Sequence, residues 1–202
     1  MEQTRSALRN FLASLGPLDE TALLTFSRHA HLVSDFTHDF ASLTSNLVPE
    51  RAAGDKAPAA DERAMNDALW EGLLMVRGGH NPRKALVVMT GATDYDSRPT
   101  SELMNAVRYS DVQVYGVAIH YQPFSLKRFG NGVLQGLAEA SGGLSFEVRS
   151  PKHLPEMVQK IAGATCSLYR IGFSPSSVNE GRRGDRFQCG VSLKWDFHSN
   201  AE

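Results

Sequence analysis

The sequence predicts an α/β protein with a doubly wound, mostly parallel sheet and helices on both faces, because short apolar strands alternate with amphipathic helices along it. Residues 85–89 and 112–119 are largely apolar, which is typical of parallel strands that are covered on both faces. A length of 202 residues is enough for one domain with a substantial core. We therefore expect a single domain, with residues 1–165 as its core and residues 166–202 as an extension of two strands.

The first expected elements are a helix and a hairpin. Over residues 8–15 the apolar side chains recur at the spacing of one helical face, and Gly16-Pro17 ends that helix. Residues 21–26 predict one strand and residues 31–33 another. Because the few residues between them cannot hold a crossover helix, these strands are expected to be antiparallel neighbours, with the second at an edge of the sheet.

Further helices and strands follow in alternation. Thr37 is expected to cap a short helix, and residues 48–60 to form a surface loop. The later elements are a helix over 65–76 ended by Gly78-Gly79, the strand 85–89, a helix over 101–109, the strand 112–119, a helix over 133–138 ended by Gly142-Gly143, a strand at 144–146, a helix after Ser150-Pro151, and a hairpin of strands 167–173 and 187–195.

Charge and composition narrow the range of partners. The 21 basic and 22 acidic residues give a net charge of -1, and therefore no long-range field that would attract nucleic acid. No apolar stretch is long enough to span a bilayer, and the first residues lack the apolar segment of a signal peptide. We expect no nucleic-acid partner and no insertion into a membrane, and the location of the protein stays open.

Motifs that carry chemistry are absent from the sequence. It has no Gly-x-Ser-x-Gly turn for a nucleophile and no glycine-rich phosphate loop. Cys166 and Cys189 lack the spacing of a zinc site; they could pair across consecutive strands, although two buried thiols are favoured. His29 and His31 could hold a metal with Asp35, but solvated histidines are far more common near a sheet edge. The sequence therefore predicts that the protein is not an enzyme.

Several segments carry a family resemblance through their order and spacing. They are LDETALLTFS (18–27), FTHD (36–39), NDAL (66–69), RKALVVMT (83–90), DVQVY (111–115), LAEASGG (137–143) and YRIGF (169–173). Together they resemble von Willebrand factor A-type domains, and a bacterial branch of that family in particular. The likeness extends over most of the chain; it implies the same fold and suggests possible export.

The resemblance also bears on a metal site. In that family a divalent cation lies at the carboxyl edge of the sheet, where an Asp-x-Ser-x-Ser turn, a Thr and an Asp hold it and a partner's carboxylate completes its shell. When positions are counted from the segments that resemble the family, Met1 falls just after the Asp-x-Ser-x-Ser position, Arg63 at the Thr position and Gly91 at the Asp position. It therefore implies a degenerate site, since the charge of Arg63 would repel a cation. No cofactor is expected, and Mg²⁺ only if the missing turn lies upstream of Met1.

Two loops at the same edge are candidates for a partner surface. Asp94, Asp96 and Ser97 follow a buried strand at the edge where open α/β sheets bind ligands. With Thr90, the two aspartates are weak candidates for a cation site of another kind, while a polar loop before the next helix is the favoured alternative. The second loop is aromatic and basic, as interface anchors are, or else packs on its own helix; its candidates are Tyr121, Phe124 and Arg128.

These patterns predict a non-catalytic domain of the adhesion type that binds a protein partner, whose identity the sequence leaves open. Two alternatives remain. One is a Mg²⁺-dependent ligand-binding domain whose Asp-x-Ser-x-Ser lies upstream of Met1. The other is an α/β hydrolase with an unmarked site, which should show a deep cleft with convergent polar groups.

Finally, the resemblance implies a gap in the sheet. In the family the first strand lies between the strands that begin here near Ala22 and Ala85, and residues 1–202 hold no counterpart of it. Such a gap leaves two rows of unpaired backbone groups. Three solutions are conceivable: the strand lies upstream of Met1, which we favour; the two flanking strands close up; or a partner chain donates a strand.

Overall fold

The computed structural model describes residues 2–26, 29–45, 65–91, 98–119 and 131–166. They belong to the first of two units of the chain, Met1–Leu168. The second unit, Tyr169–Glu202, lies outside the described residues, and so do Cys189 and the whole of the expected terminal hairpin, residues 167–195. The expected loop at 48–60 also lies outside them.

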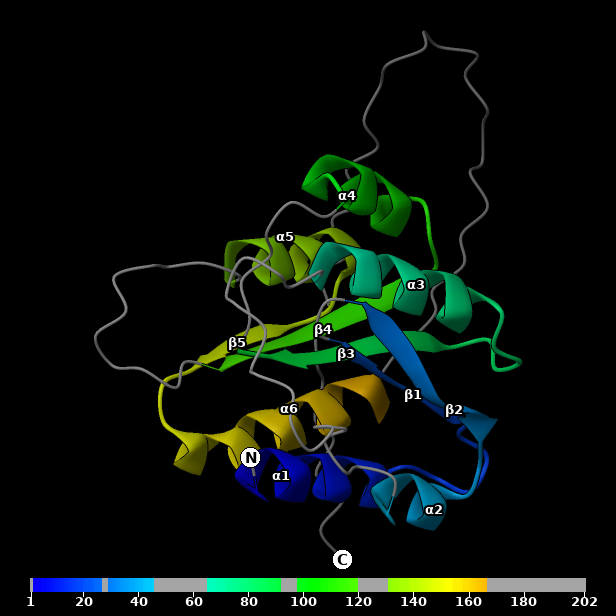
Figure 1. Ribbon diagram of the computed structural model, residues 1–202, viewed down its shortest axis with the longest axis vertical. Coiled ribbons are helices and arrows are strands. Elements are labelled where there is room, and N and C mark those ends of the chain that lie inside the picture. Colours follow the sequence, from blue (N-terminus) through cyan, green and yellow to red (C-terminus); the bar gives the residue numbers. More distant parts are fainter. Residues whose placement is uncertain (1, 27–28, 46–64, 92–97, 120–130, 167–202) are drawn as a thin grey trace, which may run out of the picture. The chain divides into compact units, whose positions relative to one another are not determined.

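Helices and strands alternate along the described residues, as the sequence predicts (Figure 1). In chain order they are α1 (Glu2–Ala13), β1 (Thr21–Phe26), β2 (Ala30–Thr37), α2 (Phe40–Ser45), α3 (Met65–Arg77), β3 (Lys84–Thr90), α4 (Thr100–Arg108), β4 (Val112–Ile119), α5 (Asn131–Ser141), β5 (Ser145–Val148), the 3-10 turn η2 (Pro151–His153) and α6 (Leu154–Cys166). The elements expected within these residues are present, and their ends differ from the expected ones by a few residues.

The described strands form two separate sheets. β3, β4 and β5 are parallel and neighbours in that order, with Lys84 opposite Val112 at one end of the first pair. β1 and β2 form an antiparallel pair with Phe26 opposite Ala30, which confirms the predicted hairpin and its edge strand. β1 and β3 are not paired with each other. The idea that the strands flanking the gap close up is therefore wrong.

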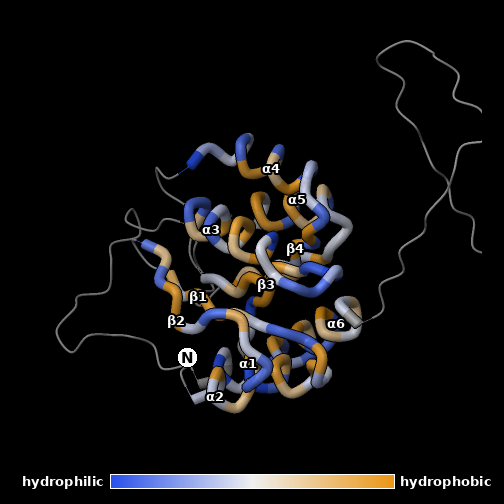
Figure 2. The backbone as a smooth tube through the Cα atoms, turned by 90° about the vertical axis from the view of Figure 1, so that its right-hand side faces the viewer, coloured by the Kyte–Doolittle hydropathy of each residue, from blue (hydrophilic) through white to orange (hydrophobic). Residues whose placement is uncertain are grey.

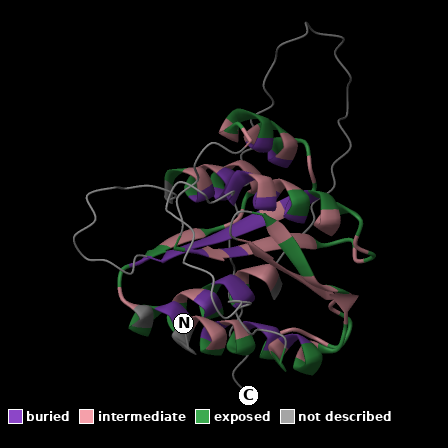
Figure 3. Cartoon of the chain, in the orientation of Figure 1, coloured by how far each residue is buried: buried purple, intermediate pink, exposed green. Residues whose placement is uncertain are grey.

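Helices cover both faces of these strands, which confirms the predicted α/β class (Figure 1). α1, α2 and α6 lie on one side, and α3, α4 and α5 on the other, with a hydrophobic core beneath each layer. β4 contributes to both cores because its side chains alternate, with Tyr115 in one and Val114 in the other. Figure 2 shows the hydrophobic stretches gathered between the layers, and Figure 3 shows β4 as the most buried strand.

Local polar contacts decide where helices begin and end. The prediction that Thr37 caps α2 is wrong, because Asp39 lies directly before the helix and its Oδ1 accepts from the backbone N–H of Ser42 at 3.0 Å. The hydroxyl of Thr37 instead accepts from the backbone N–H of Asp39 at 3.0 Å and so shapes the turn. The sequence predicts that α5 ends at Gly142-Gly143, and Gly142 there has a φ of 76°, a left-handed geometry that favours glycine.

Glu20 joins the start of β1 to the loop before β3. Its carboxylate accepts from the backbone N–H groups of His80 and Asn81 and from the ring of His80, whose Nδ1 lies 2.9 Å from Oε2. The side-chain amide of Asn81 also donates to the backbone oxygen of Leu18 at 3.1 Å. These contacts hold the starts of β1 and β3 side by side at one edge of the molecule.

Acid is expected to weaken this junction. The hydrogen bond from His80 holds the pKa of Glu20 below its ordinary value of 4.5, and the backbone N–H groups of Asn81 and His80 add to that effect. A carboxyl group with a lower pKa in the folded state stabilises the fold above its unfolded pKa, and this contribution is lost as the pH falls below 4.5 through the folded value. Glu20→Gln should therefore flatten the pH dependence of the unfolding free energy in that window.

Urea titrations across that acidic window would measure the effect. Glu139→Gln is the matched control, because Glu139 is an exposed carboxylate on α5 that accepts a hydrogen bond from the side-chain amide of Gln135 at 2.9 Å. The control should keep the acid dependence of the wild-type chain. Equal slopes for wild type and Glu20→Gln would contradict the assigned role of Glu20.

Candidate binding site at the carboxyl edge of the sheet

Only two of the residues singled out from the sequence at this edge are described. Thr90 ends β3 opposite Ala118 of β4 and is buried, and Gly91 follows it as an exposed residue. The other site candidates lie outside the described residues; they are Arg63, Asp94, Asp96, Ser97, Tyr121, Phe124 and Arg128. The geometry of the edge is therefore described from Thr90, Gly91 and the first residues of α3 and α4.

The side chain of Asn66 links α3 to the start of α4 through hydrogen bonds. It is buried in the first turn of α3, and its side-chain amide donates to the backbone oxygen of Arg98 at 2.9 Å and to the hydroxyl of Thr100 at 3.1 Å. Both acceptors lie at the start of α4. A buried amide of this kind fixes the relative position of the two helices because leaving its groups unpaired would be costly.

Arg98, whose backbone oxygen accepts from Asn66, also contacts three side chains through its guanidinium. Its guanidinium is stacked over the ring of Trp70, with 4.2 Å between Cζ and the ring centroid. Its Nε lies 3.6 Å from a carboxylate oxygen of Asp67, and its Nη1 donates to Glu102 at 3.1 Å. We call Arg98, Trp70, Asp67 and Glu102 the Arg98 cluster. It presents a cation that is about one-third exposed, at 32%, and already oriented by an aromatic face.

Sequence patterns alone do not predict this cluster. Trp70 stands out as a large aromatic residue on α3, and Asp67 lies three residues before it, on the same side of the helix. No sequence pattern points to Arg98, because its partners lie on two different helices. The partners on α3, Asp67 and Trp70, are 28 or more positions away from it in sequence. Its position directly before Pro99, the N-cap residue of α4, is the one local feature that points to a helix start.

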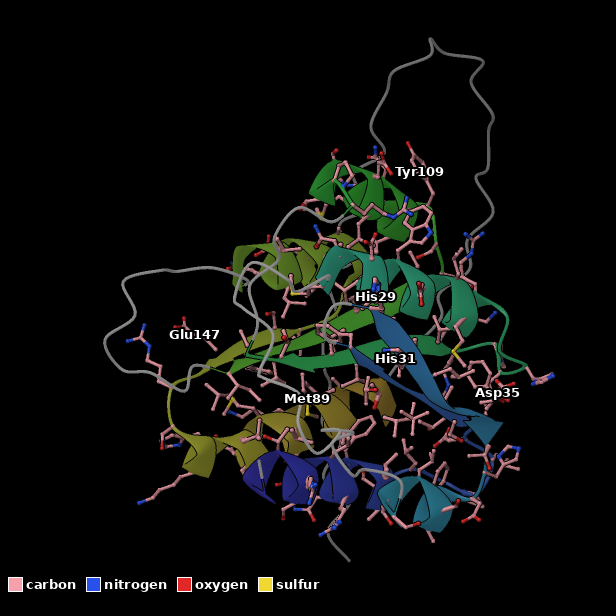
Figure 4. The ribbon with its side chains drawn as sticks, viewed as in Figure 1. His29, His31, Asp35, Met89, Tyr109 and Glu147 are labelled. Atoms are coloured by element: carbon pink, nitrogen blue, oxygen red, sulfur yellow. The ribbon has the colours of Figure 1, made fainter. Side chains whose placement is uncertain are left out.

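The three residues considered for a metal on β2 do not form a site. His29 and His31 are exposed at the start of the strand, while Asp35 lies further along it (Figure 4). The carboxylate of Asp35 accepts from the backbone N–H of Phe36 at 2.8 Å. Across the described ranges, no group of three or more His, Cys, Asp or Glu side chains is arranged to hold a metal ion.

A second feature lies away from this edge, between the two sheets. A cavity of about 540 Å³ separates β1 from β3 and is lined along the length of both strands. Side chains from α1 and α3 close its two faces, among them Phe11 and Leu69. We call this cavity the interstrand slot.

Solved structures share this fold. A von Willebrand factor type A protein from Catenulispora acidiphila matches 81% of this chain at 15% identity and a TM-score of 0.63, and the chain spans 38% of that protein. The vWF domain of the type V pili tip protein Mfa5 from Porphyromonas gingivalis matches 86% of this chain and 90% of its own length at 12% identity and a TM-score of 0.59. Proximal thread matrix protein 1 from the mussel byssus, with a zinc-occupied MIDAS motif, matches 82% of this chain and 40% of its own at 12% identity and a TM-score of 0.64.

These structural similarities establish the fold, whereas comparison by sequence finds no similar family or curated protein. No protein-family model matches the sequence, and no curated protein is significantly similar to it. The described residues adopt an α/β fold of the von Willebrand factor A type, as the resemblance of the segments implied. None of the described helices is both long and apolar enough to cross a bilayer.

Proposed function

We propose that this chain is a non-catalytic interaction domain that binds another protein at the carboxyl edge of its sheet. The observation that carries the proposal is the Arg98 cluster, in which a partly exposed guanidinium is stacked on Trp70. Arginine and tryptophan are enriched among the residues that dominate binding energy at interfaces. A side chain that is already held in place loses little conformational freedom on binding.

The fold supports the same proposal. The matching domain of Mfa5 is the vWF domain of a type V pili tip protein. In our chain the segments 92–97 and 120–130 follow the ends of the parallel strands β3 and β4 directly. Ligands of open α/β sheets bind beyond those strand ends. We therefore assign the remaining partner contacts to these segments, namely to Asp94, Asp96, Ser97, Tyr121, Phe124 and Arg128.

Parallel affinity purifications test the proposal. The full chain, an Arg98→Ala variant and a Lys160→Ala control would each be immobilised and exposed to extract of the source cells. Lys160 is the matched control because it is also a partly exposed cation paired with a carboxylate, Glu156 at 2.9 Å, but lies on α6. We expect a protein that the wild type and the control retain and that Arg98→Ala loses.

Two further results refine this experiment. Arg98→Lys keeps the charge but not the planar stack, so it should bind the partner more weakly than the wild type. Proteins retained equally by all variants would argue against a partner surface at this edge. Turnover of p-nitrophenyl esters or phosphates by the purified chain, with no partner added, would favour the hydrolase instead.

We also propose that this edge works without a metal ion. Gly91 offers no side-chain ligand where the family has an aspartate, and counting along the sequence puts Arg63 at the threonine position, where its charge would repel a cation. Adding Mg²⁺ should therefore leave the Tm of the chain unchanged. A site filled at about 100 times its Kd would instead add about 2.7 kcal/mol and raise the Tm by several degrees. A saturable rise in Tm measured by calorimetry would overturn the proposal.

A further inference from the structure

Arg98 contacts α3 at two points, through its main chain and through its side chain. Its backbone oxygen accepts from the side-chain amide of Asn66 at 2.9 Å, and its Cζ lies 4.2 Å from the centroid of the Trp70 ring. Asn66 and Trp70 are four positions apart in this helix, so their side chains are neighbours on one face of it. One face of α3 therefore determines both where the backbone of Arg98 lies and where its guanidinium is stacked.

The turn at residues 98–100 leaves the backbone of Arg98 little freedom. Pro99 is the N-cap residue of α4, with φ -56° and ψ 130°, and makes no side-chain cap hydrogen bond. A residue directly before a proline is confined largely to extended geometry. The amide of Asn66 bonds on both sides of this proline, because it also donates to the hydroxyl of Thr100 at 3.1 Å. Asn66 thus fixes a turn that is already restricted by Pro99.

The ion pairs of the guanidinium constrain Arg98 less. The side chains of Asp67 and Glu102 are 43% and 55% exposed, and the Asp67 oxygen lies 3.6 Å from Nε, beyond hydrogen-bonding distance. Ion pairs as exposed as these contribute little, because water and salt compete with them. Asn66 is only 2% exposed, and a hydrogen bond shielded from water costs more to break. Asn66 therefore constrains the position of Arg98 more strongly than either carboxylate does.

We propose that Asn66 is a positioning residue of the partner site, which sets the turn 98–100 so that the guanidinium of Arg98 lies over Trp70. The inference rests on the proposed function, in which this stack is the centre of the partner surface. A guanidinium that is aligned in advance loses little freedom when a partner binds, whereas a turn released from α3 has to be ordered at that moment. Asn66 thereby raises the affinity although it is buried and does not contact the partner.

The proton signal of the Arg98 Nε–H group reports the stack without any partner. A proton above the face of an indole ring resonates upfield, and Arg98→Lys identifies the signal by its disappearance. In the full chain we expect Asn66→Ala to move this signal most of the way back to the position of the other arginines. Affinity for the protein that the wild type captures should fall about 10-fold, because the two hydrogen bonds that order the turn are lost.

Thr100 provides a matched pair of variants for the same measurement. Thr100→Val keeps the shape of the side chain but removes the oxygen that accepts from Asn66, whereas Thr100→Ser keeps that oxygen. The bond from Asn66 to the backbone of Arg98 remains in both variants. We expect an intermediate shift of the Arg98 signal in Thr100→Val and the wild-type position in Thr100→Ser. If Asn66→Ala does not fold, this pair decides the test.

Ile161→Val is the control for a loss of stability alone. Ile161 is fully buried in the core beneath α1 and α6, on the opposite side of the sheet from α3 and α4. This variant should leave the Arg98 signal in place. An unmoved signal in Asn66→Ala, equal signals in the two Thr100 variants, or a shift in Ile161→Val as large as that in Asn66→Ala would each overturn the inference.

A further outcome separates this inference from the proposed function. If the Arg98 signal shifts in Asn66→Ala while capture of the partner is unchanged, the stack is not the centre of a partner surface. That result would overturn the proposed function, and with it the role of Asn66 in affinity, but the alignment of Arg98 by Asn66 would stand. A shifted signal together with weaker capture supports both.

Discussion

Replacing Gly143 with alanine is expected to destabilise the fold by at least about 3 kcal/mol. A Cβ atom at this position would lie 2.0 Å from the backbone oxygen of Val114 and 2.8 Å from its carbonyl carbon. Both atoms belong to β4, which is fixed between β3 and β5, so they cannot move aside as a flexible side chain would. Either the α5–β5 turn or the centre of the sheet has to shift.

The same substitution would also disturb the end of α5. The backbone N–H of Gly143 donates to the oxygen of Ala138 at 2.9 Å, and the N–H of Gly116 in β4 donates to the oxygen of Leu144 at 2.9 Å. A displaced turn breaks one or both of these bonds. The loss should therefore appear as a lower midpoint in urea unfolding, together with faster amide exchange at Gly116.

Gly163→Ala is the matched control for this prediction. Gly163 lies inside α6, and among the described residues no atom beyond its chain neighbours and the nearby backbone of its own helix lies within 4 Å of an added Cβ. Alanine is the better helix former, so the control should gain about 0.5–1 kcal/mol. A Gly143→Ala protein as stable as the wild type would mean that the backbone of β4 does not approach the turn as closely as the structure has it.

A second large effect is expected at Leu73. This side chain is only 1% exposed and lies in the core between α3 and the parallel strands. Removing three of its carbon atoms leaves a cavity in a well-packed region, so Leu73→Ala should cost about 2–5 kcal/mol. The adjacent Leu74 is 51% exposed on the same helix, and Leu74→Ala should change stability by no more than about 0.5 kcal/mol.

The two leucine variants form a matched pair. They remove the same atoms from neighbouring positions of one helix and so have the same effect on its helical propensity. The difference between their unfolding free energies, measured by urea titration, reports the burial of Leu73 alone. Similar losses for both would mean that the inner face of α3 is assigned wrongly.

The fold was predictable from the sequence where one-dimensional patterns follow burial. The apolar runs of β3 and β4 and the helical spacing on α3 reflect which face is covered, and these elements are confirmed. The shortness of the link between β1 and β2 likewise predicts their antiparallel pairing. The cap of α2 was missed because two hydroxyl- or carboxylate-bearing residues, Thr37 and Asp39, compete for that position.

The candidate site was less predictable, for a physical reason. The Arg98 cluster depends on the packing of α3 against α4, which sets Arg98 over Trp70 although 27 residues lie between them in sequence. Similarly, spacing alone favours no particular amide as the joint between these helices, yet Asn66 bonds to both Arg98 and Thr100. Contacts of this kind follow from tertiary structure, and the sequence pattern contains no trace of them.

The division of the strands into two ladders has a consequence for how the protein unfolds. Hydrogen bonds within a sheet make its strands open together, but among the described residues no such bonds join the hairpin β1–β2 to the trio β3–β4–β5. Between these two groups, cohesion depends on side-chain packing under α1 and α3 and on the junction at Glu20. For the described residues we therefore expect the hairpin and the trio to behave as separate cooperative units, with the hairpin opening at the lower free-energy cost.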